Sequence, residues 1–363
     1  MLILRKWAIV AGAVVASLSA TIPSASVRAE PADGSPVAAF VRSGDLWVKQ
    51  GKEEKRLTRG EFVRNPRWSR DGRWIAYTRR EQERELWVRR LDEAEGRLVS
   101  AKLAGGFQWA PDRNRLAYLT EEGLEWIDAE KPDRPAEAAK NISGFAWWPD
   151  GSGFVASTRA ELLPGGDWSQ VLIRRIPLGA EQPQALYALP RQSASFFAVG
   201  TSAFKWSEDG RWMAFFATPT ASLSADANTL CVLSADGATF QKLDVMANNE
   251  QWFEWSEKGN RLAYIAGEGR EATTNKRLEV ASVPLGKPAL YTPAGFVDQA
   301  FDWKGADRIV ASRAAEPSQW TSHEAERPFP FLTSNGTGAR RSNFTSASHR
   351  RPANVPTAVS SSS

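Results

Sequence analysis

A short pattern of aromatic, turn-forming and apolar residues recurs along the chain, and residues 204–216, FKWSEDGRWMAFF, are its clearest copy. Ser207 and Asp209 favour a tight turn, and Gly210 suits the turn position that requires a positive φ. The residues that follow, 211–217, are mostly apolar without alternation, which indicates a strand buried on both faces. The stretch therefore predicts the end of one strand, a turn and a returning strand.

The pattern occurs six times in the same register. The first strand of each copy ends at a Trp, namely Trp68, Trp109, Trp147, Trp206, Trp255 and Trp303. A small or apolar residue stands eight positions after each Trp, and in five copies it is Ala. Consecutive copies lie 38 to 59 positions apart, which suits a blade of four strands with loops of variable length. The repeats therefore predict an all-β protein with a β-propeller fold of four-stranded blades.

The number of blades follows from the predicted second strands. Six of them come after the Trp-marked turns, and residues 37–58 supply a seventh, because they predict three strands that lack a first strand. Seven blades are expected, with six as the alternative because the last copy, around Trp303, is irregular. In closed propellers the missing strand often comes from the other end of the chain, where residues 342–346 are the candidate for ring closure.

The repeats resemble those of TolB-type, WD-repeat-like β-propellers of exported bacterial proteins. The segments that carry the resemblance are PRWSRDGRWIAYT, FQWAPDRNRLAYL, FAWWPDGSGFVAS, FKWSEDGRWMAFF and FEWSEKGNRLAYI, and it extends over about residues 37–313. The resemblance implies a propeller that serves as a binding platform. Propellers of this kind also occur as domains of several enzymes.

The first residues of the chain predict export. Arg5 and Lys6 precede an apolar run that is too short to span a bilayer comfortably, and small residues follow near Ala29. We expect residues 1–29 to be a signal peptide, with a retained membrane anchor as the alternative. The protein is then expected in the periplasm, at the cell surface or outside the cell, with no membrane span after removal of the signal.

The remaining segments differ in composition. Residues 30–36 are expected to be a linker, and residues 37–335 to be the propeller. Residues 336–363 are rich in Ser, Thr and Arg, and we expect a disordered or truncated tail there.

The charge distribution argues against a nucleic-acid partner. The chain carries 46 Lys and Arg against 42 Asp and Glu, a net charge of +4. Residues 1–29 and 321–363 carry +3 each, which leaves −2 on the residues between them and no basic surface on the body. Cys231 is the single cysteine, so an intramolecular disulfide framework is excluded. A monomer is expected.

Long loops on one rim predict the binding face. Strands of a blade run out and back in turn, so loops that enter first strands and loops that join second to third strands lie on the same rim. The long loops all belong to this rim, at residues 158–169, 191–203, 218–228, 246–252 and 267–276. Binding sites commonly lie on such loops when a rigid scaffold holds them.

The candidate ligand-binding residues come from these loops, mainly near the blades of Trp147, Trp206 and Trp255. They are Trp168, Phe196, Phe197, Trp252 and Arg270. The alternative is that the aromatic side chains only pack the loops onto the blades. A second expectation concerns the residue before each repeated Trp, because first strands that line a central channel would bring these residues into a ring of mixed charge. They are Arg67, Gln108, Ala146, Lys205, Glu254 and Asp302.

The sequence offers little for catalysis. It contains no Gly-x-Ser-x-Gly motif, and its two histidines, His323 and His349, lie outside the repeats. We assign no catalytic residue, metal site or cofactor, and predict an exported, non-enzymatic platform that binds a protein, a peptide or a cell-envelope component. The alternative is an exported carbohydrate-active enzyme, a glycoside hydrolase or lyase, that uses rim carboxylates such as Asp167, Asp226 and Glu250.

Overall fold

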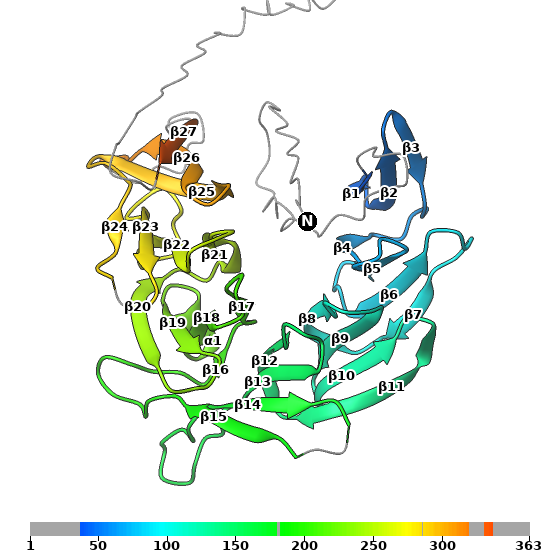
Figure 1. Ribbon diagram of the computed structural model, residues 1–363, viewed down its shortest axis with the longest axis horizontal. Coiled ribbons are helices and arrows are strands. Elements are labelled where there is room, and N and C mark those ends of the chain that lie inside the picture. The colour runs from blue at the N-terminus through cyan, green and yellow to red at the C-terminus, as the bar shows by residue number, and fades with distance from the viewer. Residues whose placement is uncertain (1–36, 180–181, 285, 319–329, 337–363) are drawn as a thin grey trace, which may run out of the picture. The chain divides into compact units, whose positions relative to one another are not determined.

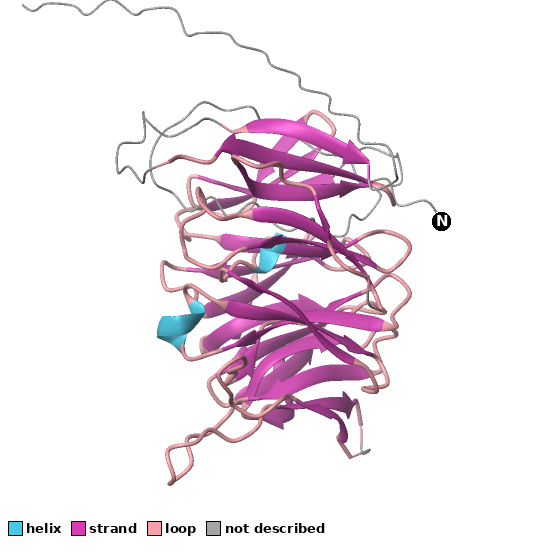
Figure 2. Cartoon of the chain, turned by 90° about the vertical axis from the view of Figure 1, so that its left-hand side faces the viewer, coloured by secondary structure: helices cyan, strands magenta, loops and turns pink. Residues whose placement is uncertain are grey.

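The computed structural model describes residues 37–179, 182–284, 286–318 and 330–336. The predicted signal peptide, the linker, the closing strand at 342–346 and all of the tail except residue 336 lie outside these residues. Strands dominate the described part (Figure 2), and its helical segments are the short α1 (Ala221–Ser224) and η1 (Glu250–Trp252). None of the helices in these ranges has the length and apolarity to cross a membrane.

The described residues form seven antiparallel sheets, and within each sheet the strands follow chain order. The first three sheets consist of β1 (Val37–Arg42), β2 (Asp45–Gln50) and β3 (Glu53–Arg56); of β4 (Arg64–Trp68), β5 (Trp74–Arg79), β6 (Glu85–Arg90) and β7 (Arg97–Ser100); and of β8 (Leu103–Trp109), β9 (Arg115–Thr120), β10 (Gly123–Asp128) and β11 (Lys131–Lys140).

The fourth and fifth sheets follow in chain order. They consist of β12 (Ile142–Trp147), β13 (Gly153–Thr158), β14 (Leu172–Pro177) and β15 (Gln184–Ala188); and of β16 (Gly200–Thr201), β17 (Lys205–Trp206), β18 (Trp212–Thr218), β19 (Asn228–Ser234) and β20 (Phe240–Met246). In the second of these sheets, β16 and β17 both pair with β18, so they are two parts of one first strand.

The last two sheets consist of β21 (Phe253–Trp255), β22 (Arg261–Ala266), β23 (Arg277–Ser282) and β24 (Ala289–Leu290); and of β25 (Phe296–Lys304), β26 (Arg308–Ala315) and β27 (Phe331–Gly336). Seven consecutive up-and-down sheets are the blades of a β-propeller fold, so the predicted fold class and the count of seven are confirmed. The predicted absence of a first strand from the sheet of β1–β3 is also seen in the described residues.

The chain divides into two compact units, residues 1–251 and residues 252–363. The first unit contains the sheets from β1 to β20, and the second contains those from β21 to β27. In the first unit, Figure 1 shows β4, β8 and β12 along one side of the successive sheets and β7, β11 and β15 along the other.

The second strands form the core of each unit. In the sheets that begin with β4, β8, β12 and β16, the second strands β5, β9, β13 and β18 are buried almost throughout. Their side chains meet those of the neighbouring sheet: Ala117 and Leu119 of β9, for example, join a cluster with Phe145 and Phe154. The uninterrupted apolar runs of the repeats are therefore explained by burial on both faces.

The repeated Ser and Asp stabilise the turn through hydrogen bonds of their side chains within it. Ser207 Oγ donates to Asp209 Oδ1 at 2.7 Å and accepts from the backbone N–H of Trp212 at 3.0 Å. Asp209 Oδ1 also accepts from the N–H of Arg211 at 3.1 Å, and Gly210 has a φ of +66°. Because all of these bonds are local, the sequence of the turn is sufficient to specify it.

The repeated Trp links neighbouring sheets through its indole N–H. Nε1 of Trp109 donates to the carbonyl of Arg67 at 2.9 Å, and Nε1 of Trp147 donates to the carbonyl of Gln108 at 3.0 Å. The same type of bond joins Trp206 to the carbonyl of Trp147 in the first unit, and Trp303 to the carbonyl of Glu254 in the second. This bond explains why Trp, rather than another large apolar residue, occupies the position.

The first strands are irregular near their beginnings. Between Arg64 and Arg67, two residues of β4 face one residue of β5, and between Leu103 and Phe107, three residues of β8 face one residue of β9. Similar shifts occur in β12 and, in the second unit, in β25. Such β-bulges bend a strand and leave part of its ladder unpaired, and they are common beside functional sites.

Candidate binding site

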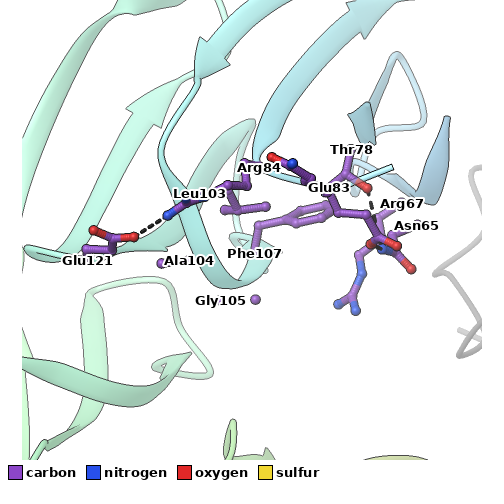
Figure 3. Close-up of a pocket in the computed structure, with 12 residues that line it drawn as sticks. Asn65, Arg67, Thr78, Glu83, Arg84, Leu103, Ala104, Gly105, Phe107 and Glu121 are labelled. Atoms are coloured by element: carbon purple, nitrogen blue, oxygen red, sulfur yellow. Dashed lines mark hydrogen bonds and ion pairs between the residues drawn. The ribbon is translucent and has the colours of Figure 1, made fainter. Parts of the chain in front are cut away.

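The described residues contain a hollow of about 550 Å³ at the beginnings of β4 and β8. We call it the β4–β8 groove. It is lined by Asn65, Arg67, Thr78, Gln82, Glu83, Arg84, Leu103, Ala104, Gly105, Gly106, Phe107 and Glu121 (Figure 3). The beginning of β4 pairs with the end of β5, and the beginning of β8 with the end of β9. The groove therefore lies on the rim that the sequence analysis predicts for binding, where second strands turn into third strands.

The bulge of β8 forms one wall of the groove. Ala104, Gly105 and Gly106 are exposed and together face the single residue Leu119 on β9. A Cβ atom at Gly106 would have no neighbour within 4 Å, whereas one at Gly105 would lie 3.0 Å from Leu119. Since β8 is also the end strand of its sheet, its backbone groups on this side have no strand beside them in that sheet.

Arg67 lies over an aromatic ring in the groove. Its guanidinium carbon is 5.2 Å from the ring centroid of Phe107, which is itself buried. Within the described part of the chain, the Arg67 side chain makes no hydrogen bond or ion pair. It is thus a cation in cation–π contact with Phe107 that retains all of its hydrogen-bond donors.

Two ion pairs flank the groove. Arg84 pairs with Glu121, which joins the β5–β6 turn to the β9–β10 turn. Glu83 Oε1 lies 3.3 Å from Arg64 Nε, and its Oε2 accepts a bond from Asn65 Nδ2 at 2.6 Å. Both carboxylates that line the groove are thus already engaged in ion pairs.

Glu250, in η1, influences Arg67, and Lys205 of β17 lies beside Glu250. Lys205 Nζ donates to the backbone carbonyl of Glu250 at 2.5 Å. Burial raises the pKa of the Glu250 carboxyl, and the charges of Lys205 and Arg67 oppose this effect. Burial also lowers the pKa of Arg67, against the opposing effect of Glu250. Arg67 and Glu250 are nevertheless both exposed to solvent, so neither lies in the core of the first unit.

The backbone beside the groove contains several left-handed residues. Phe62, Asn65, Arg80 and Glu83 have φ values between +50° and +67°, although none of them is glycine. Phe62 is also 56 % exposed, which is unusual for an aromatic residue. Residues in this conformation cost free energy and are most common at ligand sites and switches. They mark the segments on either side of β4 and β5 as candidates for function.

The predicted site residues of the first unit are mostly used in packing. Phe196 is buried in a cluster with Val171 and Phe215, and Trp168 packs against the same cluster. Phe197 is half-buried. The structure therefore brings Trp168 and Phe196 together, in the arrangement that the packing alternative describes. A role in binding remains a prediction for all three.

The other two predicted residues belong to the second unit. Trp252 is only 7 % exposed, and its Nε1 donates to the carbonyl of Gln299 at 2.9 Å. Arg270 is exposed in a loop that is held by the fully buried Lys276, whose Nζ donates to the carbonyl of Glu268 at 2.8 Å. Binding by Trp252 and Arg270 also remains a prediction, and of these two only Arg270 presents its side chain to solvent.

The residues of the β4–β8 groove were not predicted from the sequence as a site. Arg67 was predicted only as one member of a mixed-charge ring, and Phe107 only as the aromatic residue of a repeat. The signal that could have identified the wall is the pair Gly105–Gly106 inside a predicted strand, because glycine there often marks a bulge or the close approach of a ligand. The described residues contain no cluster of three or more His, Cys, Asp or Glu that could hold a metal ion.

Comparison with known proteins gives similar folds without a function. No family model and no curated protein matches the chain. Among solved structures it is similar to TolB from Acinetobacter baumannii, with 18 % identity and a TM-score of 0.42 over 69 % of this chain and 63 % of TolB. The chain thus spans less than two thirds of TolB.

Two further solved structures are similar over more of their length. One is the β-propeller domain of the Trilobed protease from Pyrococcus furiosus, with 14 % identity and a TM-score of 0.45 over 86 % of this chain and 94 % of that domain. The other is an oligogalacturonate lyase from Vibrio parahaemolyticus, with 13 % identity and a TM-score of 0.49 over 85 % of this chain and 84 % of the lyase. All three TM-scores are below 0.5, so the function of this chain has to be argued from its own residues.

Proposed function

We propose that the chain is an exported, non-enzymatic β-propeller that binds a protein, a peptide or a cell-envelope component in the β4–β8 groove. The observation that carries the proposal is the hollow itself, formed on the loop rim where the ladder of β8 opens into a three-residue bulge. Export rests on the composition of residues 1–29 and is part of the proposal.

The groove suits an extended peptide segment of such a partner. β4 and β8 are the end strands of their sheets, so a bound chain can form backbone hydrogen bonds with them. Buried Leu103 and Phe107 offer an apolar surface, while the guanidinium of Arg67 offers polar contacts. A rigid scaffold with a few polar groups around an apolar floor is typical of a binding site.

The enzyme alternative has less support at this site. A glycoside hydrolase requires a pair of carboxyl groups that can act as acid and base. The two carboxylates that line the groove, Glu83 and Glu121, are engaged by Arg64 and Arg84 respectively. The geometry therefore favours binding over hydrolysis in the β4–β8 groove.

Filling the groove should abolish binding without disturbing the fold. Gly106→Phe places a ring in open space, because a Cβ there meets no atom within 4 Å and the residue does not have a positive φ. We expect capture of the envelope ligand from a detergent extract to fall by about 10-fold or more, equivalent to ~1.4 kcal/mol of binding free energy. Quantitative mass spectrometry of the captured proteins and glycans is the measurement.

Gly165→Phe is the matched control. Gly165 also has open space around its Cβ position and no positive φ, and it lies on the same rim in the loop of Trp168. Its substitution should leave capture unchanged. Loss of capture with Gly165→Phe and full capture with Gly106→Phe would move the site to the loops predicted from sequence and overturn the proposal.

A further inference from the structure

Arg67 is the cation of the groove that has no acidic partner within it. The residues that line the groove include two arginines and two glutamates. Arg84 is paired with Glu121, and Glu83 is held by Arg64 and Asn65. The guanidinium of Arg67 is thus the remaining cationic group that can receive a ligand.

The cation–π contact with Phe107 restricts where this guanidinium lies. A ring centroid 5.2 Å from the guanidinium carbon restricts its position while leaving its N–H donors at the edge of the planar group. A planar fork of donors matches the two oxygens of a carboxylate. Arg67 is therefore prepared for bidentate recognition before any ligand arrives.

The local charge balance favours a ligand with a single negative charge. The charges of the four ionic residues that line the groove cancel, and the Glu250 carboxylate also acts on Arg67. A phosphate, with nearly two charges, would meet repulsion from Glu250, and the one other arginine that lines the groove, Arg84, is already paired with Glu121. A carboxylate would be neutralised by Arg67 alone.

The neighbouring backbone favours a peptide as the carrier of that carboxylate. The exposed residues Ala104, Gly105 and Gly106 lie in the same groove, in a segment where one residue of β9 faces all three of them. Backbone groups that a ladder cannot satisfy are suited to the amide groups of an extended peptide.

We propose that Arg67 binds a carboxylate of a peptide ligand, with the peptide backbone placed along the β8 bulge. This assignment rests on the function proposed above, since it specifies the chemistry of the ligand in the same groove. The carboxylate can be the C-terminus of the ligand or an Asp or Glu side chain, because both present the same two oxygens.

Synthetic hexapeptide libraries in three forms can test the assignment with the full chain. The first has a free C-terminal carboxylate and no acidic side chain, the second has an amidated C-terminus and one Glu, and the third has an amidated C-terminus and no acid. We expect the best binders of the first or second library to bind about 10- to 100-fold more tightly than those of the third, as measured by fluorescence anisotropy. Whichever acidic library prevails identifies the source of the carboxylate.

Arg67→Gln should remove this preference for acidic peptides. Arg67→Lys should retain only part of it, because an ammonium cannot form the bidentate contact. Arg73→Gln is the matched control, since Arg73 is exposed in the Trp-marked turn at the opposite end of β5. Circular dichroism of each variant verifies that it is folded.

The outcomes separate the two proposals. In one outcome, peptides bind and Gly106→Phe blocks them, but acidic and neutral peptides bind equally well, both to the wild type and to Arg67→Gln. The carboxylate assignment is then wrong, and the groove proposal stands. If no library yields a peptide whose binding Gly106→Phe weakens, both fail for peptides. Arg67-dependent binding of an oligogalacturonate in the absence of any acidic-peptide binding would overturn the assignment in favour of a glycan.

Discussion

Asp298→Ala is expected to lower the free energy of unfolding by ~3–5 kcal/mol, because it leaves a buried guanidinium without its partner. Asp298 is fully buried and the Arg313 side chain is 5 % exposed. Arg313 donates to both carboxylate oxygens, from Nε at 2.9 Å and from Nη2 at 2.8 Å, and Thr292 Oγ1 donates to Oδ2 at 2.5 Å. Urea denaturation followed by tryptophan fluorescence measures the change.

Two control variants test whether the loss of unfolding free energy comes from the unpaired, buried charge. Replacing both partners, as Asp298→Leu with Arg313→Met, should recover most of it, because an apolar pair no longer contains an unsatisfied charge. Asp92→Ala removes an ion pair whose acid is 66 % exposed, and we expect a loss of less than ~0.5 kcal/mol. A loss of less than about 1 kcal/mol for Asp298→Ala would show that the pair contributes little to the fold.

Trp147→Ala is expected to cost ~3–5 kcal/mol of unfolding free energy, because it removes a buried ring and leaves a cavity. The Trp147 ring centroid lies 4.2 Å from that of Phe154, and Arg115 lies 5.3 Å from the same ring. Its Nε1 links β12 to the carbonyl of Gln108 on the preceding sheet. The same urea titration measures the effect.

Trp147→Phe separates packing from hydrogen bonding. It retains an aromatic ring but leaves the carbonyl of Gln108 without the indole donor, so we expect a loss of ~1–3 kcal/mol. If Trp147→Phe were as stable as the wild type, the indole bond could not be the reason that Trp recurs in the repeats.

Local sequence was sufficient to predict the turns and the second strands. The side chains of Ser207 and Asp209 bond within their own turn, and the apolar run of β18 is buried whatever sheet packs against it. These features depend on residues close together in the chain. The fold class could therefore be derived without a structure.

Strand β11 shows where local sequence fails. Residues 131–140 contain two prolines and several charges, a composition that is unfavourable for a strand. The structure pairs them with β10, for example Glu125 with Glu137. An edge strand tolerates proline on its outer side, so its pairing with β10 overrides its composition.

The candidate site could not be predicted for a related reason. Arg67 and Phe107 are 40 positions apart, and their contact exists only because β4 and β8 belong to successive sheets. The sequence-based prediction relied on long loops such as residues 191–203, whereas the groove is bounded by short turns and a strand bulge. Sequence also could not show that Phe196 and Trp252 point into their own units.

The most direct test of the proposed site is hydrogen–deuterium exchange on the full chain, with and without the tightest-binding acidic peptide from the libraries. A ligand in the β4–β8 groove should slow exchange at residues 64–68 and 103–107 and leave residues 159–171 and 189–199 unchanged. Slower exchange confined to residues 159–171 and 189–199, with β8 unaffected, would contradict the account.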